Sequence, residues 1–411
     1  MNQATSVFIN YSSAVMLGLT ALFLINRAIP QIQDLINGGK SRVKPYSSVP
    51  SNATTTSRPV ATKQPRTFEP PIIHPVENDF DLTEVEPYPF RPFKNKKYNM
   101  TMATRRLDPE EFFVLERTYL NRINLKKKIL KERPQNHMIC HESAIPALRE
   151  IYDTTFDFLL KRFPMYFETI DDGKTFHNKI TGDWFPMDNT KLSVDELLVN
   201  VSLNVEEDFL FMLKNSDDPD FSHEYMLRGT VTCFPGGFDP VAKANLPLTK
   251  IHGPVPHYKT KLQTSMNKFF TRLQPYEYIV RNNWSIQPHT KLSALSGNHA
   301  SKDDKEEDIV PLNVNELDFN KVFLRVEKQC FTRLPKTGAI FMLIRTYTTP
   351  LSKIRAEGRG NDLCGAIDGL DQELGVYKRR AYWGNAAKSY LKYETDGLTS
   401  EVSQEEFWFE N

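Results

Sequence analysis

Residues 228–286 contain the stretch that decides the fold. It reads R-G-T-V-T-C-F-P-G-G-F-D-P from Arg228, I-H-G-P-V-P-H-Y from Ile251, and V-R-N-N-W-S-I up to Ile286. The first and last segments alternate like strands, and an amphipathic helix is expected between them. Because proline lacks an N–H group and fixes its own backbone, the prolines after His252 prevent a helix from continuing there. This stretch therefore predicts a strand, a rigid loop with one histidine, a helix and a second strand.

The segments on either side extend this unit to an α+β fold, in which helices come first and an antiparallel sheet follows. Capping patterns predict helix starts at Asp108–Pro109 and at the capping box Ser193–Glu196. Further helices are expected over 144–163, from 193 to about 214, over 262–273 and after Pro350. Period-two patterns predict strands over 224–234, 276–286, 323–331 and 339–347.

Composition excludes several classes of protein. The 411 residues carry a net charge of +1 with no basic block, which argues against a nucleic-acid-binding surface. The four cysteines, Cys140, Cys233, Cys330 and Cys364, contain no C-x-x-C pair, so a zinc ribbon or a clustered iron–sulfur site is not expected. Scattered cysteines in a chain of this length indicate reduced thiols.

The N-terminal region predicts a membrane anchor. Residues 7–25 contain no charged side chain, and about 20 apolar residues span a bilayer core. The basic residues that follow, from Arg27 to Lys44, place the body in the cytosol by the positive-inside rule. A signal peptide is the alternative, although residues 1–6 lack its usual basic charge, and an amphipathic surface helix is another.

The chain is therefore divided into an anchor, a tether and one folded domain. Seven prolines lie between Pro45 and Pro75 among Ser, Thr and Lys, which predicts an extended tether. The expected parts are a short N-terminus at 1–6, a transmembrane anchor at 7–29, a tether at 30–78, a folded domain at 79–395 with a polar insertion at 296–309, and an acidic tail at 396–411.

His252 is the first candidate for chemistry. A loop stiffened by prolines aims one imidazole with little loss of conformational entropy, and no second ligand has the spacing of a zinc or iron triad. A metal site with a single histidine would indicate haem rather than a free ion. A structural, hydrogen-bonded histidine is the alternative interpretation, and His257 competes for the same role.

Two predicted strands carry polar side chains on one face. Arg325, Glu327 and Gln329 share one side of their strand, while Arg281, Asn283 and Ser285 share a side of theirs, opposite Trp284. Such a face is either exposed to water or lines a pocket, where Arg325 would clamp a carboxylate or propionate.

The sequence does not predict nucleophilic catalysis. Cys233 lies within twenty residues of His252, but no third member of a catalytic triad is evident and no G-x-S-x-G motif occurs. Gly236–Gly237 lacks the lysine of a phosphate-binding loop.

Several segments together resemble the haem-dependent oxidative N-demethylase family, which is common in fungi. They include M-T-M-A-T-R-R-L-D-P ending at Pro109 and the motifs already quoted from 229–240, 247–258 and 281–286. The others are R-P-F-K at Arg91, L-R-V-E-K-Q from Leu324, R-L-P-K-T-G-A-I from Arg333, and I-R-T-Y ending at Tyr347. The resemblance covers roughly residues 85–390.

This resemblance implies a PAS-like antiparallel sheet that binds haem b and activates O2 to remove a methyl group from a small amine such as dimethylamine. His252 becomes the expected iron ligand. The implied pocket residues are Arg281, Asn283, Trp284, Arg325 and Glu327, and Arg281 and Arg325 are the expected cofactor contacts besides His252. The bacterial enzyme of the family receives electrons through partner subunits, so a separate reductase is expected here.

Three functions stay open on the sequence. The first is a membrane-anchored haem oxidoreductase that acts on a small amine or related metabolite. The second is a haem-binding gas or redox sensor without turnover, since fold resemblance does not fix function. The third is an interaction module that has lost the cofactor.

Overall fold

The computed structural model describes residues 68–214, 218–300, 309–398 and 400. The described residues belong to one compact unit, Arg66–Asn411. The predicted anchor, most of the predicted tether and residues 301–308 of the polar insertion lie outside the described residues. In the part that is described, no helix combines the length and the apolar character needed to cross a bilayer.

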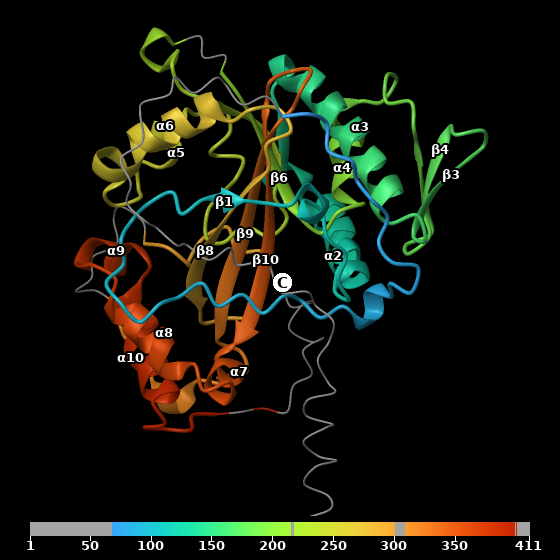
Figure 1. Cartoon of the computed structure of the whole chain (residues 1–411). Coiled ribbons are helices and arrows are strands. Elements are labelled where there is room, and N and C mark those ends of the chain that lie inside the picture. The colour runs from blue at the N-terminus through green and yellow to red at the C-terminus, as the bar shows by residue number, and fades with distance from the viewer. Residues whose placement is uncertain (1–67, 215–217, 301–308, 399, 401–411) are drawn as a thin grey trace, which may run out of the picture. The chain divides into compact units, whose positions relative to one another are not determined.

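A mixed sheet-and-helix architecture confirms the predicted α+β class (Figure 1). The main sheet has seven strands in the order β1-β8-β9-β10-β6-β7-β2, and every neighbouring pair is antiparallel. Its strands are β1 (Arg105–Arg106), β2 (Met138–Cys140), β6 (Asp208–Leu213), β7 (Met226–Val231), β8 (Ile279–Gln287), β9 (Phe323–Arg333) and β10 (Ile340–Pro350). A separate three-stranded sheet contains β3 (Phe167–Ile170), β4 (Thr175–Asn178) and β5 (Asp183–Pro186).

Helices surround the main sheet on several sides. In Figure 1, α2, α3 and α4 lie to one side of the central strands, α5 and α6 lie to the other, and α7–α10 gather at one end. Their bounds are α2 (Tyr119–Glu132), α3 (Ile145–Arg162), α4 (Val194–Ser202), α5 (Leu248–Ile251), α6 (Gln263–Arg272), α7 (Leu351–Ala356), α8 (Gly360–Asp368), α9 (Gln372–Tyr377) and α10 (Arg380–Leu391).

We call one face of the main sheet the covered face. Trp284, Val326 and Tyr347 are neighbours on it and belong to a buried core with side chains of α8 and α10. Farther along the same face, the ring of Phe341 lies 5.7 Å from that of Phe112 and 6.3 Å from that of Phe113, measured between centroids. Close packing of these aromatic groups closes this face to water.

We call the opposite face the groove face. Its apolar part carries Phe331 and Met342, and it packs against Leu248 of α5 and against Met266 and Phe270 of α6. The loop between α5 and α6 contains His252, so the segment that decided the fold lies over this face. The predicted helix at 262–273 and the strands at 276–286, 323–331 and 339–347 are confirmed to within a few residues.

Two local predictions were wrong. Asp108 caps only a 3-10 turn at Pro109–Glu111, and the expected helix begins later, at Tyr119. The capping box at Ser193 is present, but its helix ends at Ser202 because the chain then enters β6, where Phe209 and Phe211 are buried in the sheet. A capping signal thus fixes a local turn, while tertiary packing decides whether a helix follows and where it ends.

The folded domain is longer at both ends than predicted. Val76 donates its backbone N–H to the Arg162 carbonyl at 2.9 Å, so the end of the predicted tether packs on α3. At the other end, Leu398 exchanges backbone hydrogen bonds with Leu317 and Phe319, and Asp396 forms an ion pair with Arg355. The start of the predicted loose tail is therefore part of the fold.

Candidate functional site

The middle of the groove face is only half-buried, although it belongs to interior strands. The register places Met342 beside Leu210, and it places Asn283 beside Glu327. A sheet covered by helices on both faces ordinarily buries such positions. The half-buried patch consists of Leu210, Arg281, Asn283, Glu327, Gln329 and Met342.

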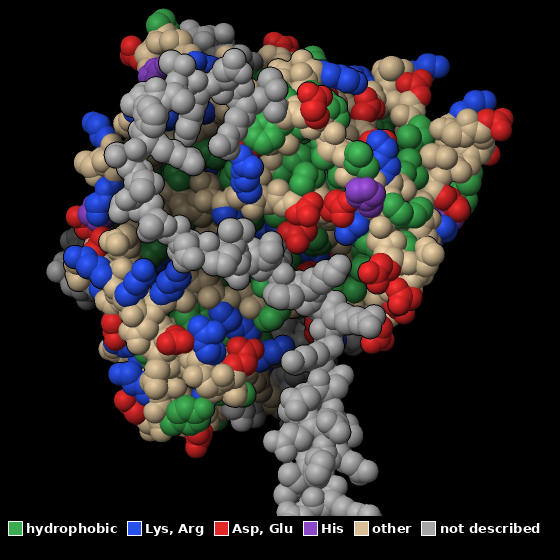
Figure 2. Space-filling model, viewed as in Figure 1, with side chains coloured by type: hydrophobic (Ala, Val, Ile, Leu, Met, Phe, Trp, Pro, Cys, Tyr) green, Lys and Arg blue, Asp and Glu red, His purple; other side chains and the backbone are tan. Residues whose placement is uncertain are grey.

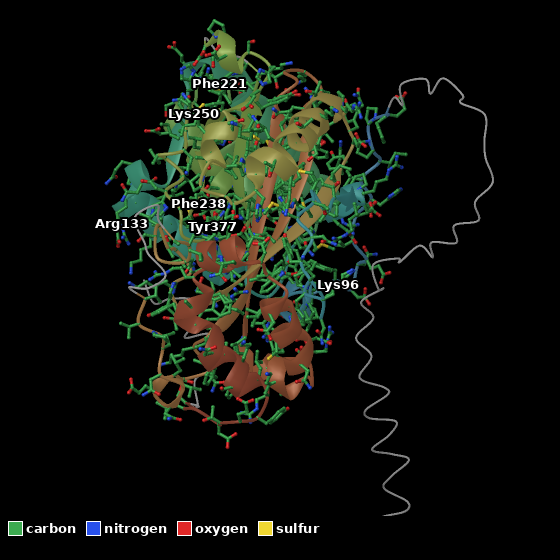
Figure 3. The ribbon with its side chains drawn as sticks, turned by 90° about the vertical axis from the view of Figure 1, so that its left-hand side faces the viewer. Lys96, Arg133, Phe221, Phe238, Lys250 and Tyr377 are labelled. Carbon is green, nitrogen blue, oxygen red and sulfur yellow. The ribbon has the colours of Figure 1, made fainter. Side chains whose placement is uncertain are left out.

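A groove opens next to this patch, between the helices α5 and α6 on one side and α9 on the other. One wall is formed by residues 97–100, and the others by the α5–α6 loop at His257 and Lys261 and by the start of α9; the groove holds about 430 Å³. Figure 2 shows the surface hollowed between α6 and α9. In Figure 3, Phe238 and Tyr377 lie between these two groups of helices. Tyr98, which lines the groove, is close enough to Arg281 to influence its pKa.

His252 is held in a defined orientation at the end of α5. Its Nδ1 donates to the Leu248 carbonyl at 2.9 Å, and its ring stacks on Tyr258 with centroids 4.9 Å apart. Burial lowers the pKa of His252, which favours the neutral imidazole. Among the described residues its Nε2 has no hydrogen-bond partner. A neutral ring with one nitrogen fixed by a carbonyl and the other free is the arrangement of a metal-binding histidine.

His257 does not have this freedom. Its backbone has a φ of 60°, and its Nε2 lies 3.1 Å from Asp371 at the start of α9. Its Nδ1 lies 3.7 Å from Glu373, so both ring nitrogens face carboxylates. Of the two histidines that the sequence leaves open, His252 is the one whose ring keeps a nitrogen without a partner among the described residues.

Arg325 has a structural task rather than the predicted clamping role. Only 1% of its surface is exposed, so the prediction of a wet face is wrong at this position. Its Nη2 donates to the Phe234 carbonyl at 2.6 Å and to Thr346, and its Nη1 donates to Gln287 and the Leu292 carbonyl. Because both terminal nitrogens are occupied, Arg325 holds the loop after β7 against the sheet and has little capacity left for a propionate.

The remaining predicted pocket residues separate into two groups. Arg281, Asn283 and Glu327 share the groove face, and Glu327 lies 3.6 Å from Arg325 Nε. Trp284 points to the covered face, where it is buried in the core, so the structure does not bring it to this group. The inclusion of Trp284 in the pocket is therefore wrong, because alternation along β8 turns it away from its neighbours.

Sequence reasoning missed a second set of side chains that joins the first. The Lys378 Nζ donates to the Trp284 carbonyl at 2.7 Å. Burial lowers the pKa of Lys378, and the nearby charge of Glu327 opposes this shift. His299 stacks on Tyr377 with centroids 4.7 Å apart, and burial lowers the pKa of His299 to about 4. No motif marks these residues. Lys378 meets β8 across 94 positions of sequence, so only the fold reveals it.

Gly236 lets the loop after β7 approach the same charges. A Cβ atom there would lie 2.8 Å from Glu327 Oε1 and 3.0 Å from Arg325 Nε. Gly236 of the T-C-F-P-G-G motif therefore serves close packing. Cys233 is fully buried and burial raises its pKa, which leaves no thiolate for a Cys–His enzyme.

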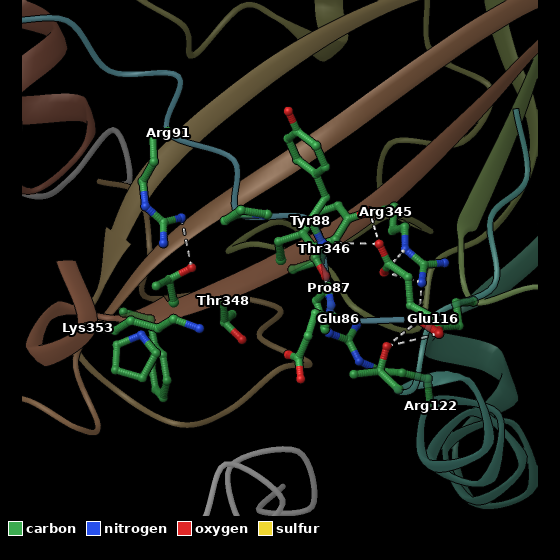
Figure 4. A pocket seen from close by; sticks show the side chains of 17 residues that line it. Glu86, Pro87, Tyr88, Arg91, Glu116, Arg122, Arg345, Thr346, Thr348 and Lys353 are labelled. Carbon is green, nitrogen blue, oxygen red and sulfur yellow. Dashed lines mark hydrogen bonds and ion pairs between the residues drawn. The ribbon is translucent and has the colours of Figure 1, made fainter. Parts of the chain in front are cut away.

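The covered face contains a different polar cluster, shown in Figure 4. Arg345 lies 2.6 Å from Glu116, 2.8 Å from Glu206 and 3.1 Å from Glu207. Tyr347 donates its hydroxyl to Glu116 at 3.1 Å, and the cluster borders a cavity of only about 50 Å³. These groups largely satisfy one another, so the cluster has the character of a closed structural site.

In the described residues, no group of three or more His, Cys, Asp or Glu side chains is placed to hold a metal ion. His252 beside the half-buried patch is instead suited to a cofactor that needs one protein ligand. The model of the family described as haem-dependent oxidative N-demethylase, alpha subunit-like, matches residues 103–388. This span includes His252, the whole groove face and Lys378. The chain belongs to the haem-dependent oxidative N-demethylase, alpha subunit-like family.

Proposed function

We propose that this protein binds haem b in the groove and removes a methyl group oxidatively from a small amine or related metabolite. One observation carries the proposal. His252 presents a neutral imidazole whose Nδ1 is fixed by the Leu248 carbonyl and whose Nε2 has no partner among the described residues. Family membership supports the reaction class.

The residues present fit a porphyrin. His252 would hold the iron, while Leu210 and Met342 on the groove face would provide apolar contact for the ring. Arg281 has a buried Nε without a hydrogen-bond partner, which suits the negative charge of a propionate or of a substrate. When bound, haem would supply the activation of O2, which no protein side chain provides. We also propose that the main sheet is PAS-like.

The side chains of this protein would orient the substrate and limit the access of water. Arg281 and Asn283 would donate hydrogen bonds from β8, and Glu327 would accept one at the same level of the sheet. Arg325 would act indirectly, since it holds Glu327 and the loop at Phe234 in place. His299 and Tyr377 would close the groove on the side of α9.

The reaction requires a supply of electrons. Oxidative N-demethylation converts an N-methyl amine, O2, two protons and two electrons into the demethylated amine, formaldehyde and water. We propose that a separate reductase delivers the two electrons. We also propose that residues 7–29 anchor the chain in a membrane with residues 79–395 in the cytosol, where a membrane-bound reductase would reach it.

An absorbance titration of the purified protein with haem b tests the proposal. We expect a Soret band that shifts on anaerobic reduction, that is lost or strongly changed in His252→Ala, and that is retained in His257→Ala. The His257 variant is the matched control because it lies in the same loop. A wild-type protein without a Soret band would contradict haem binding. The remaining alternative would then be an interaction module that has lost the cofactor.

Turnover separates the enzyme from a sensor. With an electron-donating reductase added, the enzyme should consume O2 and release formaldehyde only when an N-methyl amine is present. A protein that binds haem and O2 but releases no formaldehyde from any N-methyl amine would be a gas or redox sensor.

A further inference from the structure

Three polar side chains at the groove have hydrogen-bonding capacity that the described residues do not use. Arg281 and Asn283 make no side-chain hydrogen bond with any of them, and the Nε of Arg281 is buried. Lys378 is only 8% exposed and has three N–H donors, of which one is used, toward the Trp284 carbonyl. Buried polar groups are ordinarily paired, so this deficit indicates a missing partner.

Two other buried cations, one on α2 and one on β9, use more of their donors. Lys126 donates to the Val205 and Glu207 carbonyls at 2.9 and 2.6 Å, and its Nζ lies 3.9 Å from Asp208. Arg325 uses both terminal nitrogens. A buried Nε without a hydrogen-bond partner also occurs in Arg325 and Arg379, but Arg281 differs from both because none of its side-chain nitrogens donates to a described residue.

Around Glu327, positive side chains outnumber carboxylates. Three positive charges come from Arg281, Arg325 and Lys378. Glu327 is the one carboxylate whose charge raises the pKa of all three. The charge of Asp208 also raises the pKa of Arg325, but Asp208 forms an ion pair with Lys126. His299 is neutral at pH 7, since burial holds its pKa at about 4. Among the described residues, Arg281 and Lys378 thus form no ion pair, although the Lys378 Nζ lies 5.6 Å from the centroid of the Trp284 ring and the groove wall carries Asp371 and Glu373 beside His257.

Arg281 and Lys378 moreover destabilise each other. Burial lowers the pKa of Lys378 to about 8, and the nearby charge of Arg281 contributes to this shift. Two cations that repel each other at a half-closed site are stabilised by an anion that accepts hydrogen bonds from both.

We propose that Arg281 and Lys378, assisted by Asn283, form a binding site for a carboxylate in the groove. The carboxylate belongs either to the substrate or to a haem propionate. In the first case, which rests on the proposed function, the substrate is an N-methylated amino acid rather than a simple amine. A bare methylammonium ion would be repelled by the excess positive charge, whereas the zwitterion would bring the missing negative group.

Calorimetry on the haem-free protein tests the substrate source. N,N-dimethylglycine and dimethylamine share the dimethylammonium group and differ by the carboxylate. We expect wild-type protein to bind N,N-dimethylglycine at least tenfold more tightly than dimethylamine, and Lys378→Met to reduce this preference about tenfold. Lys392→Met, at an exposed lysine just after α10, is the control and should leave both affinities unchanged.

Absorbance titrations with haem b and with its dimethyl ester test the propionate source. If a propionate occupies the site, Lys378→Met weakens the binding of haem b about tenfold and leaves the ester unaffected. Arg281→Gln repeats both arms in case Lys378→Met fails to fold. The proposal is overturned if neither variant changes either preference. Because calorimetry needs no haem, this failure is distinguishable from a failure to bind haem or to demethylate.

Discussion

The two faces of the main sheet bury positive charge in opposite ways. On the covered face, Arg345 is 2% exposed and contacts three carboxylates within 3.1 Å. On the groove face, the side chain of Arg281 makes no hydrogen bond or ion pair with any described residue. A buried charge is costly unless it is paired, so the first arrangement holds the fold together and the second leaves room for a ligand.

The same strands carry both arrangements. Tyr347 and Arg345 of β10 point to the covered face. Thr346 between them is uncharged, and it accepts a hydrogen bond from Arg325 on the groove face. Alternation along a strand therefore allows one sheet to separate a stabilising cluster from a binding site by the thickness of its backbone. Three substitutions test this contrast, from the largest expected effect to the smallest.

Arg345→Met should cause the largest loss of stability. It leaves Glu116, Glu206 and Glu207 buried without their cation, and breaking a buried ion pair from one side costs about 3–5 kcal/mol. Urea unfolding at pH 7 measures the loss. The control is Arg117→Met, which removes an exposed pair with Glu86 and should change the free energy of unfolding by less than about 1 kcal/mol. A loss below that level in Arg345→Met would show that water reaches the carboxylates.

Glu206→Gln should change how stability depends on pH. Burial raises the pKa of Glu206 from 4.5 to about 7, against the opposing effects of Arg345 and Arg122. The folded protein then holds this proton more tightly than the unfolded chain, so the contribution of Glu206 is complete below pH 4.5 and is lost as the pH rises through 7. Relative to Glu206→Gln, wild type should lose on the order of 1–3 kcal/mol over this range.

Urea unfolding at several pH values between 4.5 and 7.5 measures this difference, with the range set by the two pKa values of Glu206. Glu132→Gln, at an exposed position at the end of α2, is the control and should leave the pH profile unchanged. A wild-type profile that runs parallel to that of Glu206→Gln would show that Arg345 keeps Glu206 ionised throughout.

Arg281→Met should have the smallest effect, and its sign should be opposite. Removal of a half-buried cation without a partner relieves its desolvation and its repulsion of Lys378, so the ligand-free protein should gain up to about 1 kcal/mol. Arg272→Met, at an exposed position at the end of α6, is the control. A loss of stability in Arg281→Met would mean that the arginine serves the fold, which would break the contrast between the two faces.

The sequence predicted the elements whose burial is periodic and local. The strand at 339–347 is recognisable because Ile340 to Ile344 form a continuous apolar run, and the helix over 144–163 has a clean apolar stripe. His252 was identified because prolines and a glycine isolate it in a loop. These features depend on neighbours in the chain, which a sequence displays directly.

What the sequence could not predict depends on contacts between distant segments. Arg325 and Arg281 have the same alternating context, yet one is held by four acceptors and the other by none. Which of the two is free is decided by Phe234, Leu292 and Thr346, whose positions follow only from the fold. Lys378 likewise gains its importance from β8, to which no sequence pattern connects it.

The edge of the main sheet has a consequence for the behaviour of the protein in solution. Strand β1 pairs with only two residues of β8, and beyond Val280 the described chain adds no further strand there. An open edge invites a second molecule to pair with it and to start aggregation. Lys378 on the Trp284 carbonyl, together with the exposed Arg105 and Arg106 of β1, places charge along this border. The hydrogen bond of Lys378 thus occupies a carbonyl on this border with which a second copy of the protein could otherwise pair.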